Sequence, residues 1–210
     1  MTDFLFDGPA DAAVTVLLAH GAGAPMDSAS MNAAAKALAA EGFRVARFEF
    51  GYMAGRRTEA GKKPPPKAET VMPEYKAAIE ALGARGKLVI GGKSMGGRVA
   101  SMIADETHAA GKVAGLLCLG YPFHPLGRPE QLRTKHLAQM QVPALIVQGT
   151  RDQMGTREEV AGYTLSPAIK LLWLEDGDHD LKPRKAISGF SAADHMQAMA
   201  QAAKAFADGL

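Results

Sequence analysis

Residues 87–102 read KLVIGGKSMGGRVASM, and this stretch decides the fold. Its first part, Lys87–Gly91, is a short apolar run typical of a buried strand, and the part after Ser94 carries apolar residues at helical spacing. Between them lies Gly92-Lys93-Ser94-Met95-Gly96, a G-x-S-x-G string. Between a strand and a helix, this string is typical of a serine nucleophile on a sharp turn, where flanking side chains would clash. An incidental glycine-rich turn is the alternative, and the flanking patterns favour the nucleophile.

Short apolar runs and helical patterns alternate along the rest of the chain. The runs are Val14–Ala19, Phe43–Phe50, Lys87–Gly91, Val113–Leu119, Ala144–Val147 and Ile169–Leu174. Apolar stripes at helical spacing fall around Met31–Leu38, Val71–Leu82, Val99–Ile103 and Met196–Phe206. This alternation predicts an α/β protein whose mostly parallel sheet carries helices on both faces. With 210 residues, 47% of them hydrophobic, we expect one domain over residues 1–210.

Composition excludes several classes of function. The formal net charge is +2, so no polyanion-binding surface and no nucleic-acid partner are indicated. The single cysteine, Cys118, excludes an internal disulfide and indicates a reducing compartment. The N-terminus, MTDFLFDGPADA, carries acids where a signal peptide carries basic residues, and the run Ala13–Ala19 is too short to cross a bilayer. We therefore expect a cytoplasmic protein with no membrane partner.

A serine nucleophile needs a base, and the base needs an orienting acid. In open α/β folds with this turn, the chain order is serine, then acid, then histidine. Asp152 follows the run Ala144–Val147, and His179 follows the run Ile169–Leu174. Because the carboxyl ends of parallel strands meet at one edge, we expect Ser94, Asp152 and His179 to meet there.

Other residues compete for the same roles. His20 belongs to a glycine-rich loop, while His108 and His195 fall in helical patterns and are expected to pack or face solvent. His124 and His136 precede Asp152 in the chain, against the required order. The acids Asp176 and Asp178 are too near His179 in sequence to orient its ring, and we expect solvated turn residues there.

Two backbone N–H groups are expected to form an oxyanion hole. Met95, the residue after the nucleophile, should supply one. The loop His20–Pro25, HGAGAP, should supply the other, with Ala22 as first choice and Gly23 as the alternate.

Nucleotide-binding alternatives are weaker. A phosphate-binding loop ending at Gly92-Lys93-Ser94 requires a glycine at position 87, where the chain has Lys87. A dinucleotide fingerprint beginning at Gly21-Ala22-Gly23, with Glu49 as ribose ligand, would place Met26 where a small residue is needed.

Three segments carry a family resemblance: GAGAPMDS at 21–28, KSMGGRVAS at 93–101 and YPFHPLGRPEQLRTKHL at 121–137. They resemble the small, lidless, dienelactone-hydrolase-like branch of the α/β-hydrolase superfamily, whose eukaryotic relatives include a testis-expressed protein and a subunit of the non-specific-lethal chromatin complex. The resemblance runs from about Val14 to the last helix. It implies an α/β-hydrolase fold without a lid domain and a Ser–Asp–His triad at the three residues above. Dienelactone hydrolases use a cysteine nucleophile, so their substrate is not carried over to this chain.

These features predict a serine hydrolase that cleaves a small ester or thioester through an acyl-serine intermediate, with no metal or organic cofactor. Acyl transfer and peptide cleavage would use the same groups, and a non-catalytic interaction module on the same scaffold is the rival function. The segments Gly51–Glu69 and Tyr121–Gln141 are expected to be irregular loops at the carboxyl edge of the sheet. Basic residues in these two loops suggest an anionic substrate, against the alternative of ordinary solvated charges. They are Arg56, Arg57, Lys62, Lys63, Lys67, Arg128, Arg133 and Lys135.

The connection after Leu119 is short. Gly120–Pro143 is proline-rich and leaves room for a loop and one short helix, and not for a helical lid. We therefore expect a shallow cleft, lined at one end by Tyr121 and Phe123, and a preference for short acyl groups.

Overall fold

The computed structural model describes residues 2–58 and 64–210, which form a seven-stranded sheet with the order β1-β3-β2-β4-β5-β6-β7. β1 pairs antiparallel with β3, and every other neighbouring pair is parallel. The strands are β1 (Phe4–Asp7), β2 (Val14–Ala19), β3 (Arg44–Phe48), β4 (Lys87–Lys93), β5 (Gly115–Leu119), β6 (Ala144–Gly149) and β7 (Ile169–Leu174).

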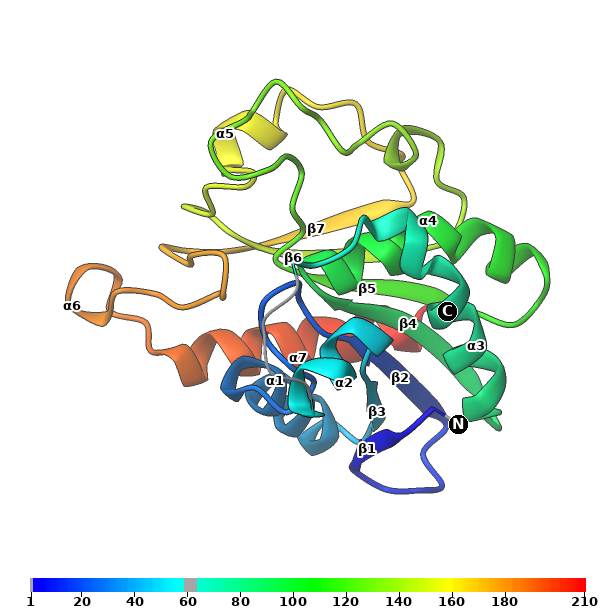
Figure 1. Ribbon diagram of the computed structural model, residues 1–210. Coiled ribbons are helices and arrows are strands. Elements are labelled where there is room, and N and C mark those ends of the chain that lie inside the picture. The colour runs from blue at the N-terminus through cyan, green and yellow to red at the C-terminus, as the bar shows by residue number, and fades with distance from the viewer. Residues whose placement is uncertain (1, 59–63) are drawn as a thin grey trace.

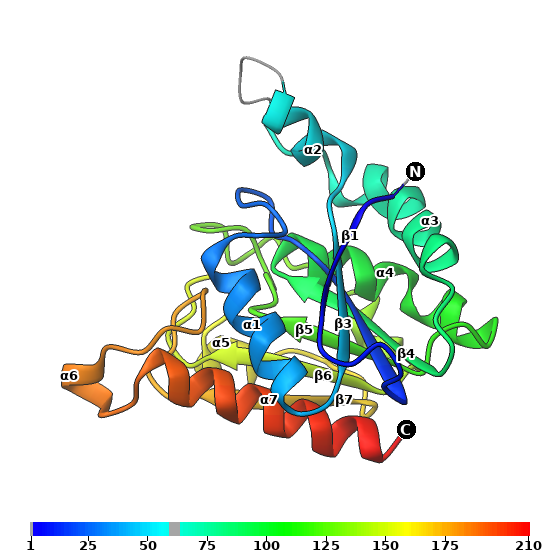
Figure 2. The same ribbon diagram turned by 90° about the horizontal axis from the view of Figure 1, so that it is seen from below.

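Helices cover both faces of the sheet (Figures 1 and 2). The helices are α1 (Ala29–Ala40), α2 (Gly51–Thr58), α3 (Met72–Leu82), α4 (Met95–Ala109), α5 (Arg157–Val160), α6 (Lys185–Ser188) and α7 (Ala192–Asp208), with 3₁₀ turns η1 (Ala68–Val71) and η2 (Leu137–Gln139). In Figure 2, α1 and α7 lie side by side on one face, while α3 and α4 lie together on the other. A capping box fixes the start of α7, because Ser191 and Asp194 each accept the other's backbone N–H.

The core is split into two layers by the sheet. Within β2, Leu17 and Ala19 join the cluster that packs beneath α3 and α4, while Val16 and Leu18 join the cluster beneath α1 and α7. Successive side chains of a strand point to opposite faces, so a strand buried on both faces is apolar throughout. The predicted mostly parallel sheet with helices on both faces is confirmed.

The edge strand β1 was not predicted. It is only four residues long, and Leu5 and Phe6 are 36% and 50% exposed. A short exposed strand lacks the continuous apolar run that marks the central strands, so its sequence carries little signal.

Part of the segment predicted to be irregular between Gly51 and Glu69 is helical, which corrects that expectation. Helix α2 begins where the N–H groups of Met53 and Ala54 donate to the carbonyl of Phe50. Gly51 and Gly55 lower the intrinsic helix propensity, and burial of Met53 in the core favours the helix instead. The two lysines predicted to lie in this loop, Lys62 and Lys63, lie outside the described residues.

The connection Gly120–Pro143 contains only the short turn η2, as expected for a lidless fold. It runs beside α5 in the upper part of Figure 1. Tyr121 and Phe123 are each 0% exposed and pack into the core, so the prediction that they line the cleft is wrong. Their rings contact each other edge-on at 4.9 Å between centroids, which fixes the start of this connection instead.

Among the residues that the structure describes, no helix is both long enough and apolar enough to span a bilayer.

Candidate active site

Ser94 lies on a sharp turn between β4 and α4. Its backbone has φ 51° and ψ −115°, a left-handed conformation that is strained for a residue with a side chain. The glycines of the G-x-S-x-G string are required by close approach, because a Cβ on Gly92 or Gly96 would lie 2.3 Å from the carbonyl oxygen of Ala19. The sequence therefore folds into the turn that was predicted, with the serine at its apex.

The structure brings together the three residues predicted to form a triad. The Oγ of Ser94 lies 2.8 Å from Nε2 of His179, and Nδ1 of His179 lies 2.8 Å from Oδ2 of Asp152. Asp152 is 0% exposed, whereas the His179 side chain is 30% exposed. The network assigns Nδ1–H of the ring as donor to the carboxylate and Nε2 as acceptor of the serine proton.

Asp152 is held by further hydrogen bonds that satisfy a buried carboxylate. Nε2 of Gln148 donates to its Oδ2 at 2.8 Å, and the N–H of Met154 donates to its Oδ1 at 2.9 Å. The Oε1 of Gln148 also accepts from the N–H of Tyr121 at 2.7 Å. The role of Gln148 was missed from the sequence, although it is the one polar side chain in the run ALIVQG of β6.

The loop that carries His179 is anchored by Asp176. Its carboxylate accepts from the backbone N–H and the guanidinium of Arg184, and it pairs with Arg151 at 3.4 Å. These hydrogen bonds lower the pKa of Asp176 to about 2. Asp176 is only 7% exposed, which corrects the expectation of a solvated turn residue. Asp178, which is partly exposed, accepts from backbone N–H groups of its own turn.

The glycine-rich loop after β2 is fixed by two side chains. The Nδ1–H of His20 donates to the carbonyl of Gly21 at 2.7 Å, and the hydroxyl of Tyr52 donates to the carbonyl of Ala22 at 3.1 Å. In a trans peptide the next N–H points away from the preceding carbonyl, so the N–H groups of Ala22 and Gly23 both point away from these anchors. Burial lowers the pKa of His20, so its ring is neutral.

Met95 is the first residue of α4, directly after Ser94. The first N–H groups of a helix have no acceptor within the helix, which makes them available for an oxyanion. Ala22 and Gly23 line the same hollow as Ser94. The choice between Ala22 and Gly23 stays a prediction.

Two hollows meet at His179. The first, of about 260 Å³, is lined by Ser94, by the loop Gly21–Ala24 and by Met154. The second, of about 300 Å³, is lined by Leu126, Arg151 and again Met154. Ligand pockets run from about 300 to 1,000 Å³, so one hollow lies just below this range and the other at its lower limit.

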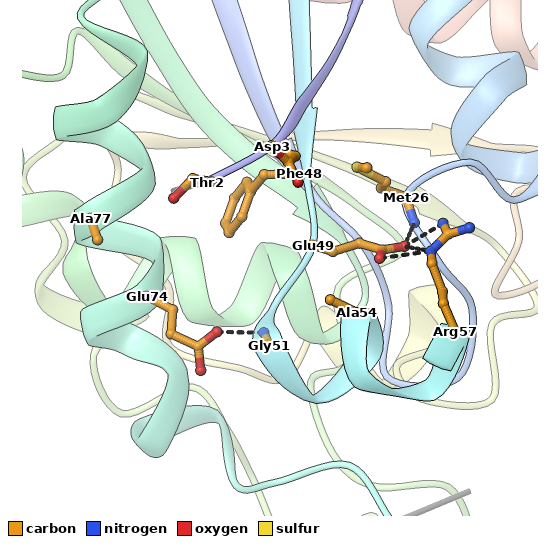
Figure 3. A pocket seen from close by; sticks show the side chains of 10 residues that line it. All are labelled: Thr2, Asp3, Met26, Phe48, Glu49, Gly51, Ala54, Arg57, Glu74 and Ala77. Carbon is orange, nitrogen blue, oxygen red and sulfur yellow. Dashed lines mark hydrogen bonds and ion pairs between the residues drawn. The ribbon is translucent and has the colours of Figure 1, made fainter. Parts of the chain in front are cut away.

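Larger hollows lie elsewhere and contain no member of the triad. Figure 3 shows one of about 410 Å³, where Arg57 pairs with the carboxylate of Glu49. Glu49 also accepts from the N–H of Met26, so it serves as an anchor between segments. Another, of about 580 Å³, lies between α1 and α7.

Among the described residues, the basic side chains predicted to attract an anion do not line the hollows at His179. The described members are absent from both linings. The charged side chains that do line them are Lys93, Arg151, Asp152, Asp178 and Asp180. This set contains two cations and three carboxylates, so it does not form a positively charged mouth.

A second serine and histidine also meet. The Oγ of Ser101 lies 2.8 Å from Nε2 of His136, but its own proton goes to the carbonyl of Arg98 at 2.7 Å. The serine is therefore the acceptor and His136 the donor, the reverse of the arrangement that a general base needs. Ser101 is 4% exposed inside α4.

Comparison with known proteins agrees with this fold. Residues 12–208 match the family described as "Alpha/beta hydrolase domain". The match covers most of the chain, and the protein belongs to this family.

Solved structures with the same fold include three proteins that are each 20% identical to this chain or less. A lidless α/β serine hydrolase from Xanthomonas campestris is 20% identical, with a TM-score of 0.69 over 98% of this chain and 89% of that one. A dienelactone hydrolase from Anabaena variabilis is 20% identical, with a TM-score of 0.71 over 98% and 90% of the two chains. Est1E from Butyrivibrio proteoclasticus, solved with ferulic acid bound, is 15% identical, with a TM-score of 0.68 over 99% and 94%.

Proposed function

We propose that this protein is a serine hydrolase that cleaves a small ester or thioester through an acyl intermediate on Ser94. One observation carries the proposal: two hydrogen bonds of 2.8 Å link Ser94, His179 and Asp152 in the order that nucleophilic catalysis requires. The resemblance to the small, lidless, dienelactone-hydrolase-like branch supports the same function.

Acylation begins when the Ser94 oxygen attacks the substrate carbonyl carbon. His179 takes the serine proton on Nε2, and the carbonyl oxygen becomes an oxyanion. The N–H of Met95 and that of Ala22 stabilise this charge. Collapse of the tetrahedral intermediate breaks the bond to the leaving group, which receives the proton from Nε2 of His179.

Deacylation repeats the sequence with water. His179 removes a proton from the water, the hydroxide attacks the acyl carbon, and the proton returns to the Ser94 oxygen as the acid leaves. Asp152 keeps its negative charge throughout, holds the ring tautomer and stabilises the imidazolium. Gln148 keeps the carboxylate in place while the ring changes charge.

Small substrates are favoured by the size of the site. The two hollows hold about 260 and 300 Å³, and the connection that builds a lid in larger relatives of this fold is short here. Methylenes beyond these hollows would stay in water and add little binding energy. Because carboxylates outnumber cations in the lining, an anionic substrate gains no attraction there, and we propose an uncharged ester.

The test is the rate of hydrolysis for a series of p-nitrophenyl esters from acetate to palmitate. We expect kcat/KM to be highest for the acetate or butyrate and to fall for longer chains, with turnover lost in Ser94→Ala. Methyl ferulate is a useful second probe because Est1E binds ferulic acid. A kcat/KM that rises steadily to palmitate contradicts the small site.

The charge preference is tested with neutral and carboxylate-bearing esters of equal length at low and high salt. We expect the neutral ester to react at least as fast, with little salt dependence. Absence of turnover with every ester and thioester, together with absence of covalent labelling by a fluorophosphonate, would instead support the interaction module.

A further inference from the structure

The immediate neighbours of the nucleophile and the base also contact each other. Lys93 precedes Ser94, and Asp180 follows His179. The Nζ of Lys93 lies 3.3 Å from Oδ1 of Asp180. The two loops that meet through Ser94 and His179 are therefore joined a second time, one residue away on each side.

The path of Lys93 is built into the fold. Gly120, at the end of β5, has φ 61°, and a Cβ there would lie 2.5 Å from the carbonyl oxygen of His179 and 3.3 Å from Nζ of Lys93. A glycine at this position leaves room for the carbonyl oxygen of His179 and the ammonium of Lys93, which both lie against Gly120. Lys93 thus reaches from the nucleophile turn to the histidine loop.

The ammonium is almost enclosed. The Lys93 side chain is 10% exposed, while that of Asp180 is 48% exposed. Asp152 and Asp178 add negative charge nearby, although burial lowers the pKa of Lys93 below its usual value. A buried lysine that loses its partner leaves an uncompensated charge, which is costly. The distance between Lys93 and Asp180 is therefore held more strictly than the distance in an exposed ion pair.

We propose that Lys93 and Asp180 are positioning residues that hold Nε2 of His179 in line with the Ser94 oxygen. The inference rests on the proposed function, since it concerns the same nucleophile and base. We call the ion pair of Lys93 and Asp180 the clamp, and the structure offers a physical reason for it. His179 lies on a loop, is partly exposed and must keep its ring aligned through the proton transfers of both acylation and deacylation. Small displacements of a reacting group are costly.

The experiment compares Lys93→Met and Asp180→Asn with the matched control Lys182→Met. Lys182 lies 3.8 Å from the other oxygen of Asp180, and its side chain is 56% exposed. We expect each clamp variant to lower kcat for p-nitrophenyl acetate about 10- to 100-fold with KM within about twofold. The control should stay within about twofold, because exposed ion pairs contribute little. Thermal melting of each variant checks folding.

Two further variants separate positioning from electrostatics. Asp180→Glu keeps a carboxylate on an exposed side chain that can adjust, and should recover kcat to within about fivefold of the wild type. In the double variant Lys93→Met/Asp180→Asn, kcat should match the slower single variant, because the two residues act as one unit. A double variant whose fold-loss in kcat is the product of the two single losses would overturn the proposal. So would pH–rate profiles that shift in opposite directions in the two single variants.

A structural readout is independent of activity. In a crystal structure of Asp180→Asn, the distance from the Ser94 oxygen to Nε2 of His179 should exceed hydrogen-bonding range or the ring should occupy alternative rotamers. An unchanged 2.8 Å contact with one ordered ring overturns the clamp. Turnover that survives in Ser94→Ala, by contrast, overturns the proposed function and leaves this distance to decide the clamp.

Discussion

Two serine–histidine pairs in this molecule have the same length and different chemistry. The pairs Ser94–His179 and Ser101–His136 each have an oxygen-to-nitrogen distance of 2.8 Å. In the first pair the serine hydroxyl donates to Nε2 of the histidine, whereas in the second the serine hydroxyl donates to the carbonyl oxygen of Arg98. The distance alone therefore does not identify a nucleophile, and the direction of the hydrogen bond does.

The residues around the two pairs also favour Ser94 as the nucleophile. Behind His179 stands Asp152, a buried carboxylate that orients the ring, whereas the other contact of Nε2 in His136 is the hydroxyl of Tyr121 at 3.5 Å. Ser94 lies on a strained turn beside a hollow, and Ser101 lies in the interior of α4. Catalysis needs access, an oriented base and donors for the developing charge, and one region of the molecule combines them.

The largest expected effect is the loss of turnover in Ser94→Ala. We expect ester hydrolysis to fall by about five to six orders of magnitude, as for other triad nucleophiles. The matched variant Ser101→Ala should keep kcat/KM within about threefold, because its hydroxyl makes only structural hydrogen bonds. Initial rates with p-nitrophenyl acetate measure the activity of both variants. Turnover lost in Ser101→Ala and retained in Ser94→Ala would exchange the roles of the two pairs.

The next effect concerns the acid. Asp152→Asn should lower kcat by about three to four orders of magnitude, because the amide favours the wrong imidazole tautomer. Asp178→Asn is the matched control on the histidine loop, since an amide oxygen can still accept the backbone N–H groups that Asp178 binds. Near wild-type activity in Asp152→Asn, with an inactive Asp178→Asn, would mean that the acid has been misassigned.

A smaller effect, on stability, is expected for the second pair. His136→Ala removes the donor to Ser101 and should lower the free energy of unfolding by about 1–3 kcal/mol at pH 8, with activity retained.

The effect should depend on pH with a definite sign. Burial, with the nearby charge of Arg98, lowers the pKa of His136. The unfolded chain therefore binds this proton at a higher pH than the folded chain does, and the wild type loses stability as pH falls through about 6.5. The gap between wild type and His136→Ala should narrow from pH 8 to pH 5 in denaturant titrations. A stability gap that widens over this range would contradict a neutral His136 ring in the folded protein.

The central strands and the placement of the triad were predictable because they depend on local signals. The run Val14–Ala19 is apolar except for Thr15 and matches β2 in full. The G-x-S-x-G string fixes a turn by steric necessity, and chain order then selected Asp152 and His179 from their competitors.

The features that were missed depend on contacts between distant segments. Gln148 and His20 serve the site through hydrogen bonds that no local pattern reveals. Tyr121 and Phe123 follow a strand that ends at the catalytic edge, yet their rings turn into the core because that burial removes large apolar surfaces from water. The pair formed by Lys93 and Asp180 joins residues far apart in sequence, so only the tertiary structure brings them together.

Covalent labelling shows whether Ser94 is the activated nucleophile. The native protein is treated with a fluorophosphonate, digested and analysed by mass spectrometry to locate the modified residue. We expect a single adduct on Ser94, formed much more slowly in His179→Ala and absent in Ser94→Ala. An adduct on Ser101, or labelling that persists in Ser94→Ala, would contradict this assignment.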